Sequence, residues 1–525
     1  MLLQTLPQLI ESAATEHSER IAIQDGDYQL SYNALNQQRL KVAKACMAAG
    51  VEKGDRCVIW APNIAEWILA AIGIQTAGGV MVPLSPRFQG AEAADIIARS
   101  GAKLLFTVTD LEKGAPLALI DDFDLPELKH RVVLQGQDTM GVDWQAFIDS
   151  GAVVSDDQVA ERAESIGPDD IMDMLFTSGT TGKPKGVLSS HSQNIRVFDT
   201  WANTVGLRSE DNYLIINPFF HSFGYKAGWL AALIKGCKIY PMKVFDKTAA
   251  MAKIQADKIT VMPGAPSLYE IILADPERKN YDLSSLRLAV TGAAPISVQL
   301  VEDLWNELGF ETVVTAYGMT ESTGVVSICR PDDTAEVISR TSGKAIDGVE
   351  MKCANPSTGE EVPRGRDGEI WVRGYNVMKG YFGMPEATAE TITDDGWMKT
   401  GDIGVMDDDG YIRITDRLKD MYIMNGENVY PAEVEAILRR CDGVAQAAVI
   451  GVPRAKQGEV GMAFVVRQAA SVLSEEQVRA HCKDNLASYK LPFYVQFVDQ
   501  LPLNASGKVM KPELKKQAAQ LLAPK

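Results

Sequence analysis

The sequence predicts an α/β fold with a large N-terminal domain of mostly parallel αβ-layered sheets, a small β-rich subdomain and a small α+β C-terminal domain. Helical and strand patterns alternate over most of the chain, as in residues 92–99 (helix) and 103–108 (strand). Repeated units of this kind are typical of parallel sheets. The 525 residues are also sufficient for several domain-sized units.

The pattern changes in the last third of the chain. Glycines punctuate short apolar runs such as residues 369–373, which predicts a β-rich subdomain over residues 342–416. The charged stretch 416–420 is a candidate hinge. We therefore predict an N-terminal domain of residues 1–418 and a C-terminal domain of residues 419–525.

The beginning of the chain predicts buried helices. Leu3, Leu6, Leu9 and Ile10 recur at helical spacing, which indicates an amphipathic helix and not a signal peptide. A later helix is expected to start with Asn63 as its cap and with Glu66 reaching back to it. The uncharged stretch Trp67–Pro86 contains glycines and a proline, so we expect a buried helix, a Gly-Gly turn and a core strand in place of a membrane span.

Charge and cysteine content narrow the class of protein. The net charge of −17 argues against nucleic acid and anionic membranes as partners, although acidic surfaces are also common in soluble proteins. The seven cysteines form no C-x-x-C pair, which predicts a reducing, cytoplasmic location. None of the five histidines lies in a zinc-binding pattern.

The strongest local signal is a glycine-rich loop after the apolar run 171–176. It reads Thr177-Ser178-Gly179-Thr180-Thr181-Gly182-Lys183-Pro184-Lys185-Gly186. Glycines let the backbone turn its N–H groups inward, and the hydroxyls and ammonium groups add donors, so the loop suits a polyphosphate. It is not the P-loop of kinases and ATPases, because Pro184 stands where that motif needs a serine or threonine.

At this loop the sequence resembles the adenylate-forming superfamily: acyl- and aryl-CoA synthetases, adenylation domains of peptide synthetases, and firefly luciferase. Four further motifs carry the resemblance in the order that the family has them. They are Tyr317-Gly318-Met319-Thr320-Glu321, Thr400-Gly401-Asp402, Asp416-Arg417-Leu418-Lys419-Asp420 and Asn504-Ala505-Ser506-Gly507-Lys508. Any one of these could be an ordinary turn or surface charge, but isolated turns do not occur in a shared order.

The resemblance implies ATP, Mg²⁺ and coenzyme A as cofactors, and it implies roles for the motifs. The loop from Thr177 to Lys185 holds the β- and γ-phosphates, Thr320 contacts phosphate and Glu321 binds Mg²⁺. Asp402 and Arg417 bind the ribose, and Lys508 bridges the carboxylate and the α-phosphate. The adenine-binding residues are Gly292, Ala293, Ala294, Tyr317 and Gly318. Cations at the reacting centre are needed because the first step brings anions together.

The resemblance also implies a mobile C-terminal domain that rotates about Lys419 after adenylation. A second face, which includes Gly426 and Glu427, then meets the thiol. Many relatives have a small residue and two glycines where this chain has Met424-Asn425-Gly426. Asparagine tolerates the left-handed backbone, so the turn can survive, but the width of the pantetheine passage is left open.

Residues 219–226 resemble the family segment that meets the acyl group. The predicted substrate contacts are therefore His221, Phe223, Gly224 and Lys226. Two interpretations of His221 stay open: it moves an aromatic gate and so contributes to catalysis, or it packs in the core. Lys226 is expected to extend to the surface, or alternatively to meet a polar group of the acid.

The same segment restricts the acid. Peptide-synthetase domains place an aspartate there for the substrate's amino group, and residues 219–226 contain none. A buried, unpaired ammonium is costly, so an α-amino acid is a poor substrate. The segment is similar to that of ligases for propanoate side chains on the residual rings of degraded steroids. Fatty acids and aryl acids stay open.

The sequence thus predicts an ATP-dependent acid:CoA ligase, AMP- and pyrophosphate-forming, for a fatty acid or a bulky alicyclic or steroid-derived propanoate. Three alternatives stay open: acyl transfer to a carrier protein, a luciferase-like oxidation, and a nucleotide sensor with a relict site. Neither a nucleic-acid partner nor a transmembrane segment is predicted. Homodimers are frequent among such enzymes, although no residue pattern here indicates one.

Overall fold

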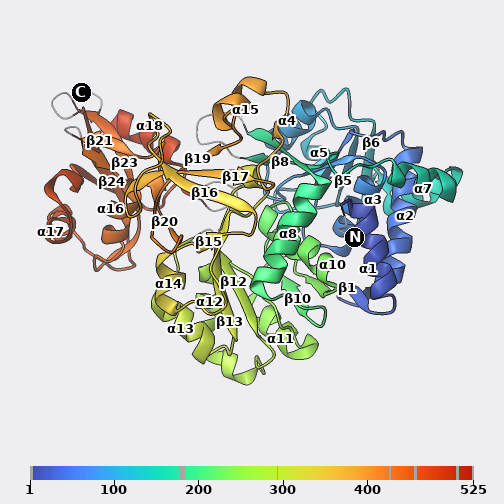
Figure 1. Ribbon diagram of the computed structural model, residues 1–525, viewed down its shortest axis with the longest axis horizontal. Helices are drawn as coiled ribbons and strands as arrows, with labels where there is room; N and C mark the ends of the chain where they lie inside the picture. The colour runs from blue at the N-terminus through green and yellow to red at the C-terminus, as the bar shows by residue number, and fades with distance from the viewer. Residues whose placement is uncertain are drawn as a thin grey trace. The chain divides into compact units, whose positions relative to one another are not determined.

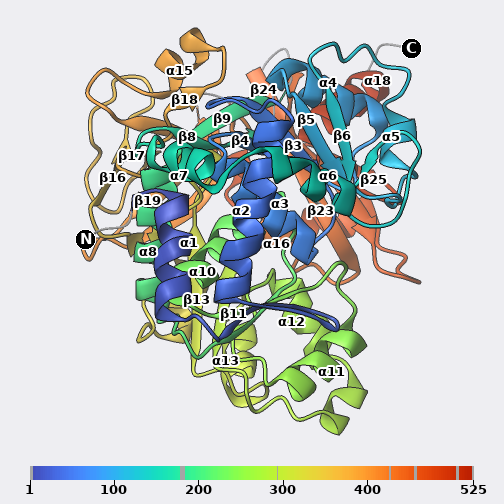
Figure 2. The same ribbon diagram turned by 90° about the vertical axis from the view of Figure 1, so that its right-hand side faces the viewer.

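The computed structural model describes residues 4–177, 184–292, 294–424, 427–454, 458–503 and 508–522, without the side chains of residues 427 and 428. Figures 1 and 2 show the chain from two sides. The described residues form two compact units. The first contains those of 1–177, 184–350 and 372–396, and the second contains those of 351–371 and 397–525.

An eight-stranded sheet of the first unit is parallel over most of its width. Its strands are β3 (Arg56–Trp60), β4 (Val80–Pro83), β5 (Leu104–Thr107), β6 (His130–Val133), β7 (Val142–Asp143), β8 (Ile171–Thr177), β9 (Lys185–Ser190) and β18 (Gly380–Tyr381). Their order across the sheet is β18-β9-β8-β4-β3-β5-β6-β7. All pairs from β8 to β7 are parallel, whereas β8, β9 and β18 pair antiparallel.

Two four-stranded sheets complete the strands of the first unit. One contains β10 (Asn212–Ile215), β11 (Lys238–Pro241), β1 (Ile21–Asp25) and β2 (Tyr28–Ser31), in that order. The other contains β12 (Leu288–Gly292), β13 (Thr312–Tyr317), β14 (Ser327–Ile328) and β15 (Lys344–Ala345). Val261 pairs in parallel with Tyr213 of β10 and with Leu288 of β12, so it joins the two sheets edge to edge.

The N-terminal helices lie where the sequence predicts them, although Leu3 of the first pattern is outside the described residues. Helices α1 (Leu6–Glu16), α2 (Tyr32–Ala48) and α3 (Ala65–Thr76) pack side by side (Figure 2). Helix α3 is buried on nearly all sides and leads through a Gly-Gly turn into β4, as the stretch Trp67–Pro86 predicted. Among the described residues, no helix is both long and apolar enough to cross a membrane.

Further helices connect the strands of the first unit, as the alternating pattern predicted. Helix α4 (Gly90–Ser100) begins with a capping box between Gln89 and Glu92. The others include α5 (Pro116–Leu119), α6 (Trp144–Ser150), α7 (Asp156–Glu164), α8 (His191–Val205), α10 (Ala231–Lys235), α11 (Lys247–Asp257), α12 (Pro266–Leu273), α13 (Val298–Asn306), α14 (Ala335–Arg340) and α15 (Pro385–Thr391).

The β-rich part predicted for the last third of the chain is a four-stranded sheet. Its strands, in order, are β16 (Val349–Ala354), β17 (Asp367–Gly374), β19 (Met398–Met406) and β20 (Ile412–Arg417). Trp371 and Trp397 pack together with Ala354 in a small core. The Lys352 ammonium lies 4.9 Å and 4.6 Å from the centres of the two indole rings.

The C-terminal part of the second unit is an α+β arrangement with a core on each face of its sheet. The strands are β21 (Tyr422–Met424), β22 (Glu427–Val429), β23 (Val444–Arg454), β24 (Gly458–Arg467) and β25 (Tyr494–Phe497). Helices α16 (Pro431–Leu438) and α17 (Glu475–Asn485) cover one face, and α18 (Lys511–Leu521) covers the other. Because strand side chains alternate, Val449 joins the first core and Ile450 the second. The domain boundary at residues 418 and 419 stays a prediction.

Candidate active site

The segment of residues 219–226, expected to meet the acyl group, is held by Asn63. The Asn63 amide accepts a hydrogen bond from Phe219 N at 2.8 Å and donates one to Asn217 O at 2.9 Å. The prediction that Asn63 caps the following helix is therefore wrong, because its polar atoms bind this segment. The first N–H of α3 donates to Asp25 Oδ2 at 3.0 Å instead.

His221 is exposed at the start of the short helix α9 (Ser222–Gly224). Its Nδ1 accepts a hydrogen bond from Phe223 N at 3.3 Å, so the ring caps this helix. The interpretation of His221 as a packed core histidine is therefore wrong, and its role at a gate stays a prediction. Gly224 meets a steric requirement, since a Cβ there would lie 2.2 Å from Asn217 O.

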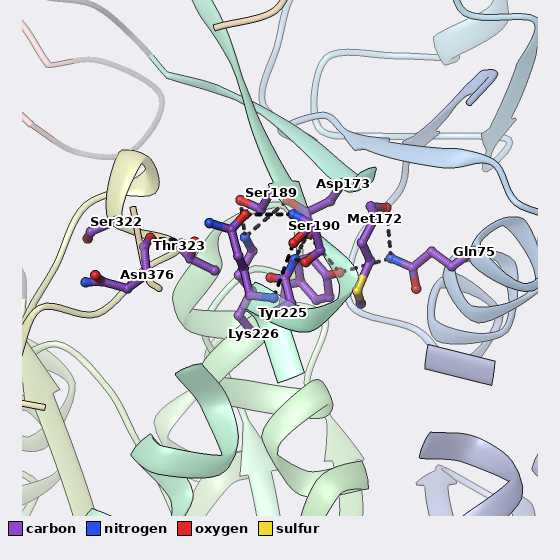
Figure 3. Close-up of polar contacts among 12 residues, drawn as sticks. Gln75, Met172, Asp173, Ser189, Ser190, Tyr225, Lys226, Ser322, Thr323 and Asn376 are labelled. Carbon is purple, nitrogen blue, oxygen red and sulfur yellow. Dashed lines mark hydrogen bonds and ion pairs between the residues drawn. The ribbon is translucent and has the colours of Figure 1, made fainter. Parts of the chain in front are cut away.

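The ammonium of Lys226 is enclosed within the first unit (Figure 3). Lys226 lies in a π-helix (Tyr225–Leu230), and its Nζ is 3.1 Å from Oδ1 of Asp173 on β8. Both side chains are 0% exposed. The expectation that Lys226 extends to the surface is wrong, because the π-helix directs its side chain toward β8 and β9. Its polar partners in the structure are Asp173 and Ser189, and the contact with the acid stays a prediction.

The glycine-rich loop joins β8 to β9, so its ends, Thr177 and Lys185, lie directly opposite one another in the sheet. The Lys185 ammonium is 4.6 Å from the centre of the Tyr381 ring. The Tyr381 hydroxyl donates to Glu321 Oε1 at 3.0 Å. Burial and the Glu321 charge raise the pKa of Tyr381, so the phenol remains a donor. Tyr381 thus links a predicted phosphate residue to the predicted magnesium ligand.

The predicted adenine-binding residues lie at the carboxyl ends of two parallel strands. Gly292 ends β12, and Tyr317 ends the neighbouring β13. A Cβ on Gly292 would lie 2.9 Å from Ala316 O, and one on Gly318 would lie 2.1 Å from Gly324 O, so both positions require glycine. Crevices at the carboxyl ends of parallel strands are where α/β proteins bind nucleotides.

The third motif of the first unit follows β13 directly. Thr320 and Glu321 form a short 3₁₀ turn (Thr320–Ser322), in which Thr320 is half-buried and Glu321 is buried. The Glu321 carbonyl accepts a hydrogen bond from Met378 N at 2.9 Å, which anchors this turn to the chain just before β18. The turn therefore presents a hydroxyl and a buried carboxylate close to Tyr381.

Three predicted residues meet in the second unit. Asp402 on β19 lies opposite Arg417 on β20, and Arg417 Nε is 3.3 Å from Asp402 Oδ1. Lys508 is within electrostatic reach of both. Although Lys508 is exposed, the surrounding protein lowers the pKa of its ammonium by desolvation, and Arg417 lowers it further, whereas Asp402 raises it. Their convergence is consistent with a site for anionic ligands.

The predicted hinge residue, Lys419, is exposed in the turn after β20. Asp416, at the end of that strand, accepts a hydrogen bond from Ala432 N at 2.8 Å and thereby caps helix α16. Burial raises the pKa of Asp416 to about 6. The hinge motif therefore includes a carboxyl group that binds a neighbouring helix.

Some predicted residues lie outside the described part of the chain. They are Ser178, Gly179, Thr180, Thr181, Gly182, Lys183, Ala293 and Gly426, together with the side chain of Glu427. Ala294, next to them, is exposed. Sequence analysis missed Asp173 and Tyr381. Asp173 gave a signal, because it is the one charged residue in the apolar run 171–176.

The first unit has a hairpin that carries the glycine-rich loop and glycine-lined strand ends, and the second has a carboxylate–guanidinium pair beside a lysine, as the resemblance to adenylate-forming enzymes implies. The family described as AMP-binding enzyme matches residues 10–382, and the AMP-binding enzyme C-terminal domain matches residues 433–508. The chain belongs to this family. It is an AMP-forming acyl-CoA synthetase, which makes an acyl-CoA thioester through an acyl-adenylate from ATP, a carboxylic acid and coenzyme A.

Similar proteins include two ligases and a solved structure. The 3-[(3aS,4S,7aS)-7a-methyl-1,5-dioxo-octahydro-1H-inden-4-yl]propanoyl:CoA ligase of Rhodococcus jostii is 46% identical over 98% of each chain. The ligase of the same name from Mycobacterium tuberculosis is 46% identical over 98% of this chain and 99% of its own. ATP-bound MatB from Rhodopseudomonas palustris is 29% identical, with a TM-score of 0.85 over 98% of this chain and 99% of its own.

Enzymes of this family use Mg²⁺, and the residues present suit it. Among the described residues, no cluster of three or more His, Cys, Asp or Glu side chains could hold a metal ion. Mg²⁺ usually binds through one or two carboxylates together with substrate phosphates. The single buried carboxylate of Glu321 fits that arrangement. When bound, Mg²⁺ neutralises charge on the phosphate oxygens.

Proposed function

We propose that this synthetase activates a propanoate side chain on a methylated bicyclic dione, the ring remnant of a degraded steroid. The observation that carries the proposal is 46% identity to two ligases for such an acid, over 98% of this chain in both cases. The match extends over nearly the whole length of the chain, so it is not confined to the stretch that holds the nucleotide motifs.

The charge of the acid segment supports a bulky monocarboxylate. Residues 219–226 contain no acidic residue, and their one lysine, Lys226, is neutralised by Asp173. The segment therefore offers neither an anion for an amino group nor an available cation for a second carboxylate. Burying either charged group without a partner would be costly. A ring system with carbonyl groups carries no such cost.

Roles for the first unit follow from the contacts around Tyr381. We assign the β8–β9 loop, from Thr177 to Lys185, to the leaving phosphates, and Thr320 and Glu321 to phosphate and Mg²⁺. The hydrogen bond from Tyr381 would fix the Glu321 carboxylate in place. Gly292, Tyr317 and Gly318 would leave space for the flat adenine ring at the strand ends.

Roles for the second unit follow from the exposed cations. We assign Asp402 and Arg417 to the ribose, and Lys508 to the carboxylate and α-phosphate during adenylation. The lowered pKa of Lys508 reflects an ammonium that the protein has already partly desolvated, so less hydration is lost when it contacts the reactants. Lys419 would be the hinge, and Gly426 and Glu427 would meet coenzyme A. A cytoplasmic location and a homodimer stay predictions; the seven cysteines, all unpaired, agree with the former.

The test is a panel of acids supplied with ATP and Mg²⁺, with hydroxylamine trapping the acyl-adenylate. The panel contains the bicyclic propanoate, octanoate, palmitate, an aryl acrylate, an α-amino acid and a short dicarboxylate. We expect the highest kcat/KM for the bicyclic propanoate, with AMP and pyrophosphate as products. The full reaction with coenzyme A, or with a pantetheine-bearing carrier protein in its place, identifies the acceptor. A clear preference for a linear or aryl acid would contradict the proposed substrate.

A further inference from the structure

Asp173 of β8 and Lys226 of the acid segment form a fully buried ion pair. Neither side chain has exposed surface, and Lys226 Nζ lies 3.1 Å from Asp173 Oδ1. The same ammonium is 3.3 Å from Oγ of Ser189 on β9. Lys226 thus contacts both strands of the hairpin that carries the glycine-rich loop (Figure 3).

Neutral side chains surround the carboxylate of this pair. Asp173 Oδ2 accepts hydrogen bonds from Asn194 Nδ2 at 2.8 Å and from the Tyr225 hydroxyl at 3.3 Å. Gln75 Nε2 donates to the Tyr225 hydroxyl at 3.0 Å. The network therefore joins α3, β8, β9, α8 and the π-helix, and Figure 3 shows Asp173, Ser189, Tyr225 and Lys226 close together.

Stability alone does not account for such a pair. Desolvation raises the pKa of Asp173 and lowers that of Lys226, and in each case the partner's charge opposes the shift. A buried ion pair pays for the loss of hydration of two charges, so replacing both by apolar or neutral groups of similar volume is often neutral or stabilising. The pair instead fixes the relative position of the two segments that carry it, because each charge is stable in the interior only beside the other.

The geometry that it specifies connects two ligand-binding segments. Asp173 shares β8 with Thr177, the first residue of the glycine-rich loop. Lys226 is the last residue of the acid segment, which also contains His221. π-Helices, such as the one containing Lys226, occur frequently at functional sites. The ion pair therefore connects the acid segment directly to the phosphate hairpin.

We propose that Asp173 and Lys226 are positioning residues for adenylation, which set the acid segment against the β8–β9 hairpin so that the carboxylate meets the α-phosphate. This inference rests on the roles proposed above for the two segments, but not on which acid is used. Neither residue touches the reactants; the pair acts through the segments it joins. Its removal should therefore lower kcat for adenylation more than it weakens ATP binding.

The deciding variant neutralises both partners: Asp173→Asn combined with Lys226→Met. Either single change leaves a buried charge without its partner and is expected to impair folding. The double variant should unfold at or above the parent temperature. Its kcat for hydroxamate formation should fall about tenfold to a hundredfold, which is the effect of misplacing reactants by up to about 1 Å. Calorimetric binding of ATP, without acid, should be unchanged.

A matched control neutralises the partly exposed pair of Lys235 and Asp199 in the same part of the chain. Its N–O distance is 2.7 Å, and it joins α10 to α8. Lys235→Met with Asp199→Asn should leave kcat unchanged. Rates are measured with the bicyclic propanoate, or with octanoate if the propanoate is not activated, so the substrate proposal can fail separately. A double variant at Asp173 and Lys226 that does not fold, or that folds and reacts at the parent rate, would overturn the positioning role.

Discussion

Two ion pairs, one in each unit, have carboxylates that are similarly buried and cations that differ greatly in solvent exposure. In the first unit, Asp173 and Lys226 are both 0% exposed. In the second unit, the Asp402 side chain is 10% exposed but that of Arg417 is 49% exposed. The carboxylate is buried in both cases, so the difference lies in whether solvent or a ligand can reach the cation.

This difference separates two uses of charge. An enclosed cation interacts only with the protein groups around it, so its charge can organise the fold but cannot bind a ligand. An exposed cation beside a buried carboxylate has a fixed position and is still accessible. Lys508, exposed and within electrostatic reach of Asp402 and Arg417, belongs to the second kind. We therefore expect variants of the exposed cations to affect ligand chemistry directly.

The largest effect is expected for Lys508→Ala. It removes the cation assigned to the carboxylate and α-phosphate, so acyl-adenylate formation should fall by about a hundredfold to a thousandfold, as for a lost stabiliser of developing charge. Thioester formation from supplied acyl-AMP should stay near the parent rate. Lys515→Ala, an exposed lysine on α18, is the control. Equal loss in both half-reactions would refute the accessible-cation role.

A smaller effect is expected for Asp402→Asn, which weakens the position of Arg417 and a proposed ribose contact. The KM for ATP should rise about tenfold, the value of about one charge-assisted hydrogen bond, while kcat changes less. This is the opposite of the pattern expected for the enclosed pair. Asp408→Asn, in the turn after β19, is the control. A fall in kcat with an unchanged KM for ATP would remove the distinction between the two pairs.

A weaker effect again is expected for His221→Ala in the first unit. The exposed ring caps a short helix in the acid segment, so its loss should raise the KM for the acid by less than about tenfold. The KM for ATP should not change. Steady-state kinetics with each substrate varied in turn separates the two. If ATP were affected more than the acid, the assignment of residues 219–226 to the acid would be wrong.

The two units should also respond differently to acid. Burial lowers the pKa of His191, whose Nδ1 accepts a hydrogen bond from Leu6 N, to about 4. Between pH 6.5 and 4 the unfolded histidine binds a proton that the folded one excludes. The first unit therefore loses stability as the pH falls, by up to about 3 kcal/mol from this group.

Asp416 contributes a pH dependence of stability with the opposite sign, because burial raises its pKa to about 6. Below pH 6 the folded carboxyl takes up a proton before the unfolded one does, so its contribution is fully present below about pH 4 and is lost as the pH rises to 6. The size is again up to about 3 kcal/mol. Hydrogen exchange measures how the stability of each unit changes with pH. It is carried out on peptides of each unit in the parent, His191→Gln and Asp416→Asn proteins. Parallel slopes in parent and variants would contradict both assignments.

Much of the fold could be predicted from local pattern. The apolar run before the glycine-rich loop became β8, and the uncharged stretch became a buried helix and a strand. These features depend on neighbours in sequence. Asn63 was misassigned because a polar side chain before a helix is usually a cap, whereas here tertiary contacts to residues 217 and 219 bind it.

Parts of the site depend on contacts that no local pattern contains. Asp173 and Lys226 each interrupt an apolar stretch, and two opposite charges in core segments could have suggested a pair. Their meeting requires the packing of the π-helix on β8 and β9, which is a property of the tertiary structure. Tyr381 gave no signal, because its contact with Glu321 joins strand β18 to a turn far away in sequence.

Oxygen-18 in the carboxyl group of the acid tests the central claim most directly. If the carboxylate attacks the α-phosphate of ATP, one labelled oxygen passes to AMP when the thiol of coenzyme A displaces it. Mass spectrometry should therefore find AMP with one oxygen-18 and pyrophosphate with none. Unlabelled AMP, or label in pyrophosphate or inorganic phosphate, would contradict activation through an acyl-adenylate.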